Sequence, residues 1–275
     1  MKIGVIGVGN LASAVLSGSL KSGAFTADQF LLYDLFAQKT AQMKESFGTK
    51  TAASPTEIAE SCDVVILAVK PKDFAHLLCE ISPALSRKDP LVVSVAAGLS
   101  VGYIASFLEY GAKIARIMTN INASVGGAMT AYCFGERVTD EDKSFLEVFC
   151  KSFGDAVELE EAMFAQFGVL AGCVPAFAYK FVDEIARAGV QIGVRKDLAL
   201  RIAAQTVLGS ARVAGLCEVH PYALIDRVCT PGGTTIEGIA ALDALGFSDA
   251  VHQAVLASYN KDIALTRAKE QEKNK

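Results

Sequence analysis

The chain of 275 residues has no dense cluster of positive charge outside its C-terminal tail, and its formal net charge is −4. Proteins that bind nucleic acid through phosphate groups carry such a cluster, so we expect no nucleic-acid partner. Charged residues make up only 20% of the chain and hydrophobic residues 52%, which excludes a disordered or fibrous protein. The length predicts two domains.

Disulfide and metal-binding patterns are also absent. The seven cysteines form no C-x-x-C pair and most stand in apolar runs, so we expect reduced thiols and a cytoplasmic location. The three histidines, His76, His220 and His252, are too dispersed for a recognisable metal site, and we expect no metal. The first residues enter a predicted strand and lack the pattern of a cleavable signal peptide.

Two uncharged segments, residues 90–108 and 162–179, approach the length of a membrane span. Gly98 interrupts the first, and Gly172 and Pro175 interrupt the second. No orienting cluster of Lys and Arg flanks either segment. We therefore expect both to be buried elements of a soluble protein without a membrane partner.

The first part of the chain alternates short apolar runs with helical segments. We predict strands at residues 2–6, 30–33, 63–69, 91–95 and 113–117, edge strands at 129–134 and 156–159, and helices at 11–22, 38–47 and 101–110. The continuous apolar runs are typical of strands that helices cover on both faces of a parallel sheet. The pattern predicts a Rossmann-like, doubly wound, mostly parallel α/β domain over residues 1–160.

From residue 161 onward, apolar residues recur at helical spacing, as in one long helix that Pro175 kinks and that ends at Gly189 or Gly193. Further helices are predicted at residues 197–216, 234–245 and 248–266, before a frayed polar tail. Helices this apolar need a covering surface, so we expect residues 161–275 to form an all-helical dimerisation domain. The alternative is a monomeric helical domain folded back against the sheet.

The turn after the first predicted strand reads Gly7-Val8-Gly9-Asn10-Leu11-Ala12, which matches G-x-G-x-x-A. In this motif the first glycine permits a tight turn and the second lets a pyrophosphate approach. The small third residue permits close packing of helix on strand. Because strand, turn and helix occur in the required order, the sequence predicts a dinucleotide site.

Asp34 ends the second predicted strand, where a carboxylate can accept both ribose hydroxyls of NAD and repels the 2′-phosphate of NADP. Residues 35–38 supply no arginine for that phosphate, although Lys39 is close. The pattern therefore favours NADH over NADPH. The alternative is a strand-end aspartate that caps the next helix.

Two further segments follow predicted strands at the edge where doubly wound folds bind ligands. They are Ala68-Val69-Lys70-Pro71 and Ala96-Ala97-Gly98. Lys70, beside a turn stiffened by proline, is a candidate contact for a ribose or a substrate carboxylate. An isolated lysine is more often merely solvated.

Near the C-terminus, Thr230-Pro231-Gly232-Gly233-Thr234-Thr235 precedes a predicted helix. The glycines let a ligand approach the backbone, the threonines supply hydroxyl donors, and the helix N-terminus carries unpaired N–H groups. This combination suits a small carboxylate. A turn followed by a threonine N-cap is the alternative.

Together these segments resemble pyrroline-5-carboxylate reductase, and the likeness covers nearly the whole chain in the right order. It is carried by GVGNLA, LAVKP, SVAAGLS, RIMTN, GAMTAY, LRIAAQTVLGSARV and HPYALIDRVCTPGGTTIEGIAAL. The resemblance implies a Rossmann domain followed by a helical domain that interlocks in homodimers, often within larger rings. It also implies NAD(P)H-dependent reduction of 1-pyrroline-5-carboxylate to L-proline, by hydride transfer to the imine carbon.

The resemblance assigns roles to the candidate residues. Gly7 to Ala12 hold the pyrophosphate, and the segments containing Lys70 and Gly98 line the nicotinamide side. The backbone of Gly232 and Gly233, with Thr234 and Thr235, grips the substrate carboxylate across the dimer interface. Thr235 also matches the position proposed to hydrogen-bond the imine nitrogen.

Two further positions follow from the resemblance. Glu218 matches an acidic position found near the substrate in some members. The family usually reads M-P-N-T-P after the fifth predicted strand, where this chain reads Met118-Thr119-Asn120-Ile121-Asn122. Asn120 is kept and lies near the nicotinamide, while both prolines are lost.

Two alternatives to this activity stay open. The altered loop at residues 118–122 is consistent with a paralogue that reduces a different cyclic imino acid. A cofactor-binding regulatory paralogue without turnover is the other alternative. The intact glycines and the intact Thr234-Thr235 pair argue against that second reading.

Overall fold

The computed structural model describes residues 1–108 and 111–273, with side chains described as far as residue 264. The chain divides into two compact units. The first comprises Met1–Gly172 and Thr266–Lys275, and the second comprises Cys173–Leu265. Each unit is described separately below.

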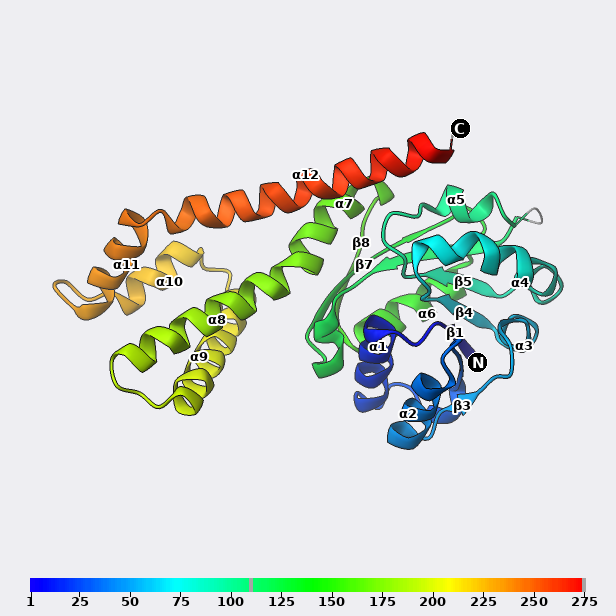
Figure 1. Ribbon diagram of the computed structural model, residues 1–275, viewed down its shortest axis with the longest axis horizontal. Coiled ribbons are helices and arrows are strands. Elements are labelled where there is room, and N and C mark those ends of the chain that lie inside the picture. Colours follow the sequence, from blue (N-terminus) through cyan, green and yellow to red (C-terminus); the bar gives the residue numbers. More distant parts are fainter. Residues whose placement is uncertain (109–110, 274–275) are drawn as a thin grey trace. The chain divides into compact units, whose positions relative to one another are not determined.

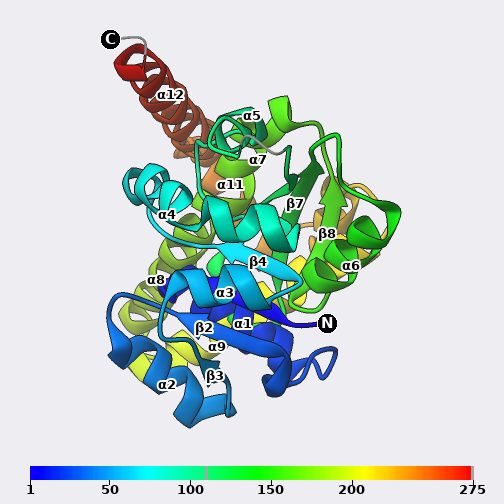
Figure 2. The same ribbon diagram turned by 90° about the vertical axis from the view of Figure 1, so that its right-hand side faces the viewer.

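The first unit is built on an eight-stranded sheet, shown in Figures 1 and 2. Its strands are β1 (Ile3–Ile6), β2 (Phe30–Tyr33), β3 (Lys50–Thr51), β4 (Val64–Leu67), β5 (Leu91–Ser94), β6 (Lys113–Met118), β7 (Ala128–Phe134) and β8 (Gly154–Glu158). The strand order is β3-β2-β1-β4-β5-β6-β7-β8, and every neighbouring pair is parallel except β6 with β7. The first six strands thus follow the doubly wound order, in which the chain changes direction across the sheet at β1.

Helices cover both faces of this sheet (Figure 1). They are α1 (Asn10–Lys21), α2 (Ala37–Phe47), α3 (Pro55–Ser61), α4 (Phe74–Lys88), α5 (Val101–Ala105) and α6 (Asp140–Lys151). Side chains alternate along each strand, so Ile3 and Val5 pack with α1, α2 and α6, while Ile6 packs with α3, α4 and α5. The all-apolar strands are therefore buried on both sides.

Single-turn helices complete the first unit: η1 (Ala27–Gln29), η2 (Pro71–Asp73), η3 (Ile121–Val125) and η4 (Glu161–Met163), followed by α7 (Phe164–Phe167). The predicted strands and the helices at residues 11–22 and 38–47 are confirmed to within a few residues. The helix predicted at residues 101–110 is shorter, because α5 ends at Ala105, and Tyr110 lies outside the described residues. The prediction missed β3, α3, α4 and α6.

The second unit is helical. It contains α8 (Val174–Gln191), α9 (Lys196–Leu216), α10 (Pro221–Val228), α11 (Thr234–Ala244) and most of α12 (Phe247–Lys273). Helices α8 and α9 lie side by side (Figure 1) and meet through the small residues Ala186, Ala199 and Ala203. The tail expected to fray after residue 266 instead continues as helix α12 to Lys273.

The predicted long helix around Pro175 is divided. Helix α7 passes into a π-helical turn, η5 (Gly168–Cys173), before α8 begins at Val174. Proline at residue 175 cannot donate the helical hydrogen bond, and its ring crowds the carbonyl four residues earlier. A wider π turn is one way for a helix to accommodate this disruption.

Candidate functional site

The glycine turn lies between β1 and α1. The Gly7 N–H donates to the Tyr33 carbonyl at 2.8 Å, and Gly7 has a φ of +96°. A Cβ on Gly7 would lie 2.8 Å from the backbone carbonyl of Ala68, so the turn has no room for a side chain. Helix α1 begins at Asn10, and the first N–H groups of a helix lack acceptors within it. The turn and the start of α1 therefore present backbone N–H groups without a helical acceptor at the edge of the sheet where β1 ends.

Asp34 lies just past the end of β2 and faces this turn. Its carboxylate accepts the Val8 N–H at 2.7 Å and the Phe36 N–H at 2.9 Å. Lys39 Nζ lies 3.3 Å from the same oxygen that accepts the Val8 N–H. The Asp34 side chain is 8% exposed, whereas that of Lys39 is 42% exposed. Asp34 thus braces the glycine turn, and Lys39 lies beside it with its ammonium accessible.

The segments after β4 and β5 reach the same edge of the sheet. The Ala68 N–H donates to Ile6 O at 2.8 Å, and the Val95 N–H donates to Leu67 O at 3.1 Å, so the parallel register continues to this edge. Lys70 is exposed, while Ala68, Val69 and Pro71 are half-buried. Ala96 is buried, and Ala97 and Gly98 are exposed.

Asn120 lies at the C-terminal end of β6, which is also at this edge, and is 7% exposed. Its Nδ2 donates to the carbonyl of Ala171 at 2.9 Å, and its Oδ1 accepts the Asn122 N–H at 3.1 Å. The neighbouring Thr119 hydroxyl is bonded to that of Thr130 at 2.8 Å, and both are buried. Side-chain hydrogen bonds therefore hold the loop.

The remaining predicted residues belong to the second unit. A turn between α10 and α11 is closed by the Gly233 N–H, which donates to Thr230 O at 2.9 Å, and Gly232 has a φ of +67°. Thr234 and Thr235 open α11 and are exposed, and within the described part of the chain their hydroxyls make no hydrogen bond. Glu218 is exposed in the segment before α10.

The predicted residues thus form two groups, each assembled within its own unit. Parallel strand ends bring together the first group, which comprises Gly7, Val8, Gly9, Asn10, Leu11, Ala12, Asp34, Ala68, Val69, Lys70, Pro71, Ala96, Ala97, Gly98 and Asn120. The second group comprises Glu218, Gly232, Gly233, Thr234 and Thr235.

Sequence reasoning overlooked a buried ion pair. Arg116, inside β6, is 6% exposed, and its Nη1 lies 3.0 Å from Oε1 of Glu161. The same oxygen accepts the Val101 N–H at the start of α5, at 2.8 Å. The Arg116 guanidinium carbon also lies 4.6 Å from the ring centroid of Phe164. An arginine between the apolar residues Ala115 and Ile117 of a predicted strand was the signal available in the sequence.

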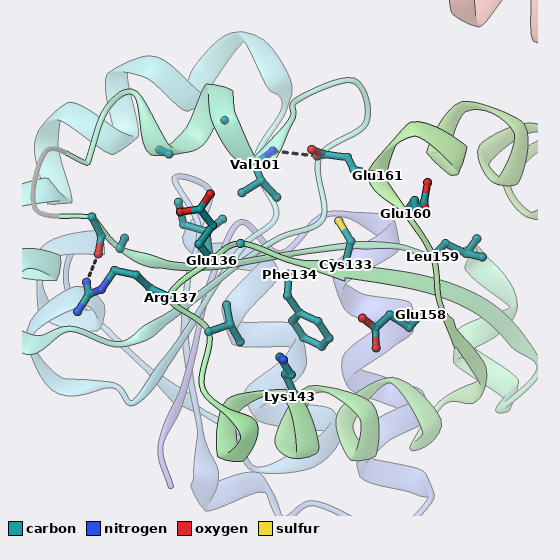
Figure 3. Close-up of a pocket in the computed structure, with 17 residues that line it drawn as sticks. Val101, Cys133, Phe134, Glu136, Arg137, Lys143, Glu158, Leu159, Glu160 and Glu161 are labelled. Atoms are coloured by element: carbon teal, nitrogen blue, oxygen red, sulfur yellow. Dashed lines mark hydrogen bonds between the residues drawn. The ribbon is translucent and has the colours of Figure 1, made fainter.

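Figure 3 shows a hollow that Glu161 lines together with Val101 and Cys133. Because β7 runs antiparallel to β6, this hollow lies toward the end of the sheet opposite the glycine turn. Burial raises the pKa of the Cys133 thiol to about 11, so the thiol stays protonated at neutral pH. Cys133 is therefore not an activated nucleophile.

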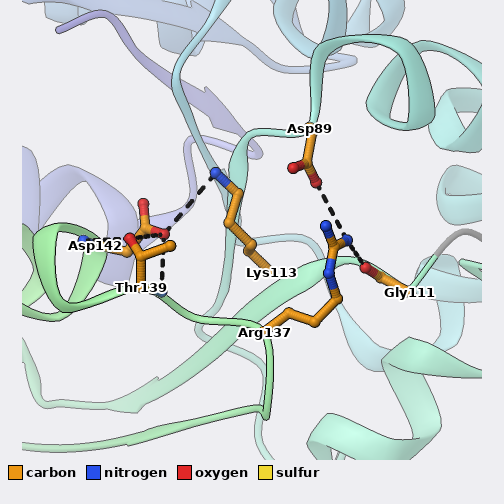
Figure 4. A network of polar contacts seen from close by, with 6 residues as sticks. All are labelled: Asp89, Gly111, Lys113, Arg137, Thr139 and Asp142. Atoms are coloured by element: carbon orange, nitrogen blue, oxygen red, sulfur yellow. Dashed lines mark hydrogen bonds and ion pairs between the residues drawn. The ribbon is translucent and has the colours of Figure 1, made fainter.

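The charged residues near this end are paired with one another (Figure 4). Arg137 donates to the Gly111 carbonyl and lies 3.5 Å from Asp89. Lys113 lies 3.8 Å from Asp142, which forms a capping box with Thr139 at the start of α6. These contacts join the strand ends to α6, and we read them as structural.

Two features of the described residues bear on partners. No group of three or more His, Cys, Asp and Glu side chains there is arranged to hold a metal ion. One described helical run, Glu161–Gln191, is long and apolar enough to cross a membrane by length and composition alone. Core helices of other proteins meet the same criterion, so the run is weak evidence for a membrane span.

Comparisons with known proteins identify relatives of both parts of the chain. A family model described as pyrroline-5-carboxylate reductase dimerisation matches residues 161–265. A second, described as NADP oxidoreductase, coenzyme F420-dependent, matches residues 2–98. The boundary predicted at residue 160 falls where the first match begins, whereas the first compact unit extends to Gly172.

Two relatives that match over nearly their full length are pyrroline-5-carboxylate reductases. The chain is 37% identical over 267 residues to pyrroline-5-carboxylate reductase of Escherichia coli (strain K12), covering 97% of this chain and 99% of that one. It is 35% identical over 256 residues to pyrroline-5-carboxylate reductase of Aquifex aeolicus (strain VF5), with 93% and 94% covered.

Two solved structures of pyrroline carboxylate reductases are also similar to this chain over nearly its whole length. The pyrroline-5-carboxylate reductase of Coxiella burnetii matches with a TM-score of 0.87 at 29% identity, covering 96% of this chain and 98% of that one. The pyrroline carboxylate reductase of Plasmodium falciparum, solved with NADP bound, matches with a TM-score of 0.86 at 27% identity, covering 97% and 98%.

Proposed function

The chain belongs to the pyrroline-5-carboxylate reductase family, and we propose that it reduces 1-pyrroline-5-carboxylate to L-proline with NAD(P)H as the hydride donor. One observation carries the proposal: the full-length match to such reductases coincides with an intact glycine turn and an intact Gly232-Gly233-Thr234-Thr235 segment. The dinucleotide domain corresponds to residues 1–160 and the helical domain to residues 161–275.

The glycine turn fits a pyrophosphate. At Gly9, no described atom lies within 4 Å of the place a Cβ would occupy, so a phosphate can reach the backbone there. Val8, Asn10, Leu11 and Ala12 complete the turn and the first residues of α1, where N–H groups and the helix dipole favour an anion. The segments with Lys70 and Gly98 line the nicotinamide side, together with Ala68, Val69, Pro71, Ala96 and Ala97.

We propose that NADH is the favoured cofactor, because the Asp34 carboxylate lies where the adenosine ribose binds in this fold. One oxygen accepts the Phe36 N–H and keeps a second lone pair, while the other accepts both the Val8 N–H and Lys39 Nζ. A ribose hydroxyl can occupy the remaining lone pair or replace Lys39, whereas a 2′-phosphate would meet a like charge. Lys39 reduces that repulsion, so NADPH remains a second cofactor.

The second group fits the substrate carboxylate. The N–H groups of Gly232 and Thr234 lie at or before the start of α11, whose eleven residues give a full helix dipole, while the Gly233 N–H donates to Thr230 O. No side chain caps this helix, which leaves its first donors for a ligand. Glu218 supplies a nearby negative charge that favours a protonated imine.

The reaction needs a hydride at the imine carbon and a proton at the imine nitrogen. When bound, NAD(P)H supplies the hydride. We propose that the Thr235 hydroxyl donates a hydrogen bond to the imine nitrogen and supports its protonation. Lys70 attracts the substrate carboxylate by its charge or donates a hydrogen bond to a ribose hydroxyl. No histidine base is required, because a protonated iminium is already electrophilic.

We propose that the site is completed by a second subunit. In the second unit many large apolar side chains are exposed, among them Phe181 at 40%, Ile202 at 51% and Val213 at 49%. The matched dimerisation family includes these helices. A homodimer would cover this surface and, in this proposal, bring Thr235 of one subunit to the glycine turn of another. Larger rings would then be built from such dimers, without nucleic acid or membrane.

The seven cysteines are free, which supports the cytoplasmic location we propose. The test of the function is steady-state oxidation of NADH and NADPH with 1-pyrroline-5-carboxylate, beside the six-membered imine piperideine-2-carboxylate. We expect turnover with the five-membered ring to exceed that with the six-membered ring. A reversed preference would favour the paralogue suggested by the altered loop at residues 118–122. No turnover with either imine, despite tight NADH binding, would favour a regulatory protein.

A further inference from the structure

Asn120 makes two hydrogen bonds that join parts of the chain far apart in sequence. Its Nδ2 donates to the carbonyl of Ala171, 51 residues away, at 2.9 Å. Its Oδ1 accepts the Asn122 N–H at 3.1 Å and shapes the turn that opens η3. Both polar atoms are used, and the residue is 7% exposed. The side chain is therefore turned into the protein.

The carbonyl of Ala171, to which Asn120 donates, lacks its usual α-helical hydrogen-bond donor. In an α-helix, the carbonyl of Ala171 would accept the N–H of the residue four positions later. That residue is Pro175, which has no N–H. The helix widens into the π turn η5 here, and Ala171 within it is 7% exposed. The Asn120 amide supplies the donor that proline removes.

Asn120 is also one of two attachment points for the segment Glu161 to Ala171. At the first point, Glu161 is bonded to Arg116 in β6 and to the Val101 N–H at the start of α5. Phe164 then packs with Ala131 and Cys133 of β7. At the second point, beyond the C-terminal end of β6, Asn120 holds Ala171. The segment therefore follows β6 from its buried arginine to the edge that carries the glycine turn.

We propose that Asn120 is a positioning residue, which fixes the end of the segment Glu161 to Ala171 at the sheet edge that carries the glycine turn, by supplying a hydrogen bond that Pro175 cannot make. The proposal rests on the proposed function, because positioning matters only if Thr235 must meet the nicotinamide. The expectation that Asn120 contacts the cofactor itself stays a prediction, because each polar atom of its side chain makes one bond within the protein and keeps one further N–H or lone pair.

Two substitutions separate the bonds of Asn120. Asn120→Asp keeps an acceptor for the Asn122 N–H but cannot donate to Ala171. Asn120→Ala removes both bonds. Pro175→Ala adds an N–H four residues after Ala171, so the helix backbone can donate a hydrogen bond to the Ala171 carbonyl. The double variant Asn120→Ala/Pro175→Ala therefore lacks the long-range bond but leaves the carbonyl with a donor.

Three readouts are measured on the full-length protein. Hydrogen exchange follows the backbone amides of residues 168–176, titration calorimetry gives the Kd for NADH, and kinetics separate kcat from KM for the imine. For Asn120→Asp we expect exchange about tenfold faster over residues 168–176, the effect of losing one buried hydrogen bond. We also expect kcat/KM for the imine to fall about tenfold, with the Kd for NADH changed less than about twofold.

Rescue by Pro175→Ala is the decisive comparison. Relative to Asn120→Ala alone, we expect the double variant Asn120→Ala/Pro175→Ala to recover at least half of the lost exchange protection and of the lost kcat/KM, on a logarithmic scale. Thr119→Val is the matched control, because it breaks the adjacent buried bond to Thr130 but leaves Ala171 served by Asn120. We expect Pro175→Ala to give Thr119→Val no recovery.

A Kd for NADH that rises as much as kcat/KM falls would overturn the proposal and make Asn120 a cofactor contact. Strictly additive losses in the double variant would overturn it as well. If the wild-type protein fails to reduce the imine, the proposed function fails. The exchange and calorimetric results would still decide whether Asn120 donates to the Ala171 carbonyl, so the two failures are distinguishable.

Discussion

The Asp34 carboxylate accepts the backbone N–H of Val8 at 2.7 Å, so the residue after β2 holds the glycine turn after β1 in place. The same carboxylate accepts the Phe36 N–H and lies 3.3 Å from Lys39 Nζ. One side chain therefore shapes the glycine turn and, in the proposed cofactor site, places a negative charge beside the ribose. We propose that cofactor choice and turn geometry depend on this same residue.

Substitution of Asp34 separates these two effects. Asp34→Asn keeps a carbonyl acceptor for Val8 but removes the charge. We expect NADH to bind about tenfold more weakly, the scale of one charged hydrogen bond, while NADPH binds equally well or better. Lys39→Ala should weaken NADPH binding alone. Calorimetric titration with both cofactors measures this, and an equal loss of both in Asp34→Asn would mean that Asp34 only braces the turn.

Substitution of Gly7 is predicted to lower stability, whereas substitution of Gly9 is predicted to lower NADH affinity. Gly7→Ala places a Cβ 2.8 Å from the Ala68 carbonyl at a φ of +96°, so we expect a loss of about 1–3 kcal/mol in the free energy of unfolding. Gly9→Ala meets no described atom within 4 Å, so stability should change by less than about 0.5 kcal/mol. Its NADH affinity should nevertheless fall at least about tenfold, because the methyl group occupies the phosphate approach.

Urea denaturation and NADH titration of the two glycine variants give the test. The reverse pattern, with Gly7→Ala stable and Gly9→Ala binding NADH normally, would show that the pyrophosphate binds elsewhere.

Thr235 carries the proposed hydrogen bond to the imine nitrogen. We expect Thr235→Ala to lower kcat by about one to three orders of magnitude, the usual range for one polar catalytic group. Thr235→Ser keeps the hydroxyl and should retain most of the activity. Single-turnover kinetics with saturating NADH measure the step directly. An unchanged rate in Thr235→Ala would remove this hydroxyl from the mechanism.

The buried thiols give a prediction about pH. Burial raises the pKa of Cys133 from its ordinary value of 9.0 to about 11 and raises that of Cys150 further, while Cys79 is exposed. Iodoacetamide at pH 8 should therefore label Cys79 well before Cys133 or Cys150. A folded-state pKa above the unfolded one means that the unfolded chain loses its proton first, so stability should fall as pH rises from about 9 toward 11.

Mass spectrometry of peptides after timed labelling checks the thiol prediction, with labelling in denaturant as the control. Rapid modification of Cys150 in the folded protein would contradict its burial in the sheet domain.

Local patterns predicted the part of the site that depends on neighbouring residues. Strand, glycine turn and helix follow one another in the sequence, and the ends of parallel strands meet at one edge, so Gly7, Asp34, Ala68 and Ala96 were expected to lie at one edge of the sheet, where the structure places them. Helix α6 was missed although Thr139 and Asp142 form a capping box, a signal that the sequence contains. Helices α3 and α4 were also missed.

The break after α7 depends on contacts that periodicity does not register. The apolar spacing around Pro175 continues unbroken, so the pattern predicted one kinked helix. The π turn accommodates Pro175, which has no N–H to donate to Ala171. Asn120, 51 residues away from Ala171, donates to that carbonyl instead. Arg116 and Glu161 likewise form their pair only when β6 and η4 are brought together.

The most direct test of the proposed reaction follows deuterium from NADH deuterated at the transferable position of the nicotinamide. With 1-pyrroline-5-carboxylate as substrate, the account predicts L-proline carrying one deuterium at ring carbon 5, the former imine carbon, and none at the α-carbon. Proline without deuterium, deuterium at the α-carbon, or no proline at all would contradict direct hydride transfer to the imine of this substrate.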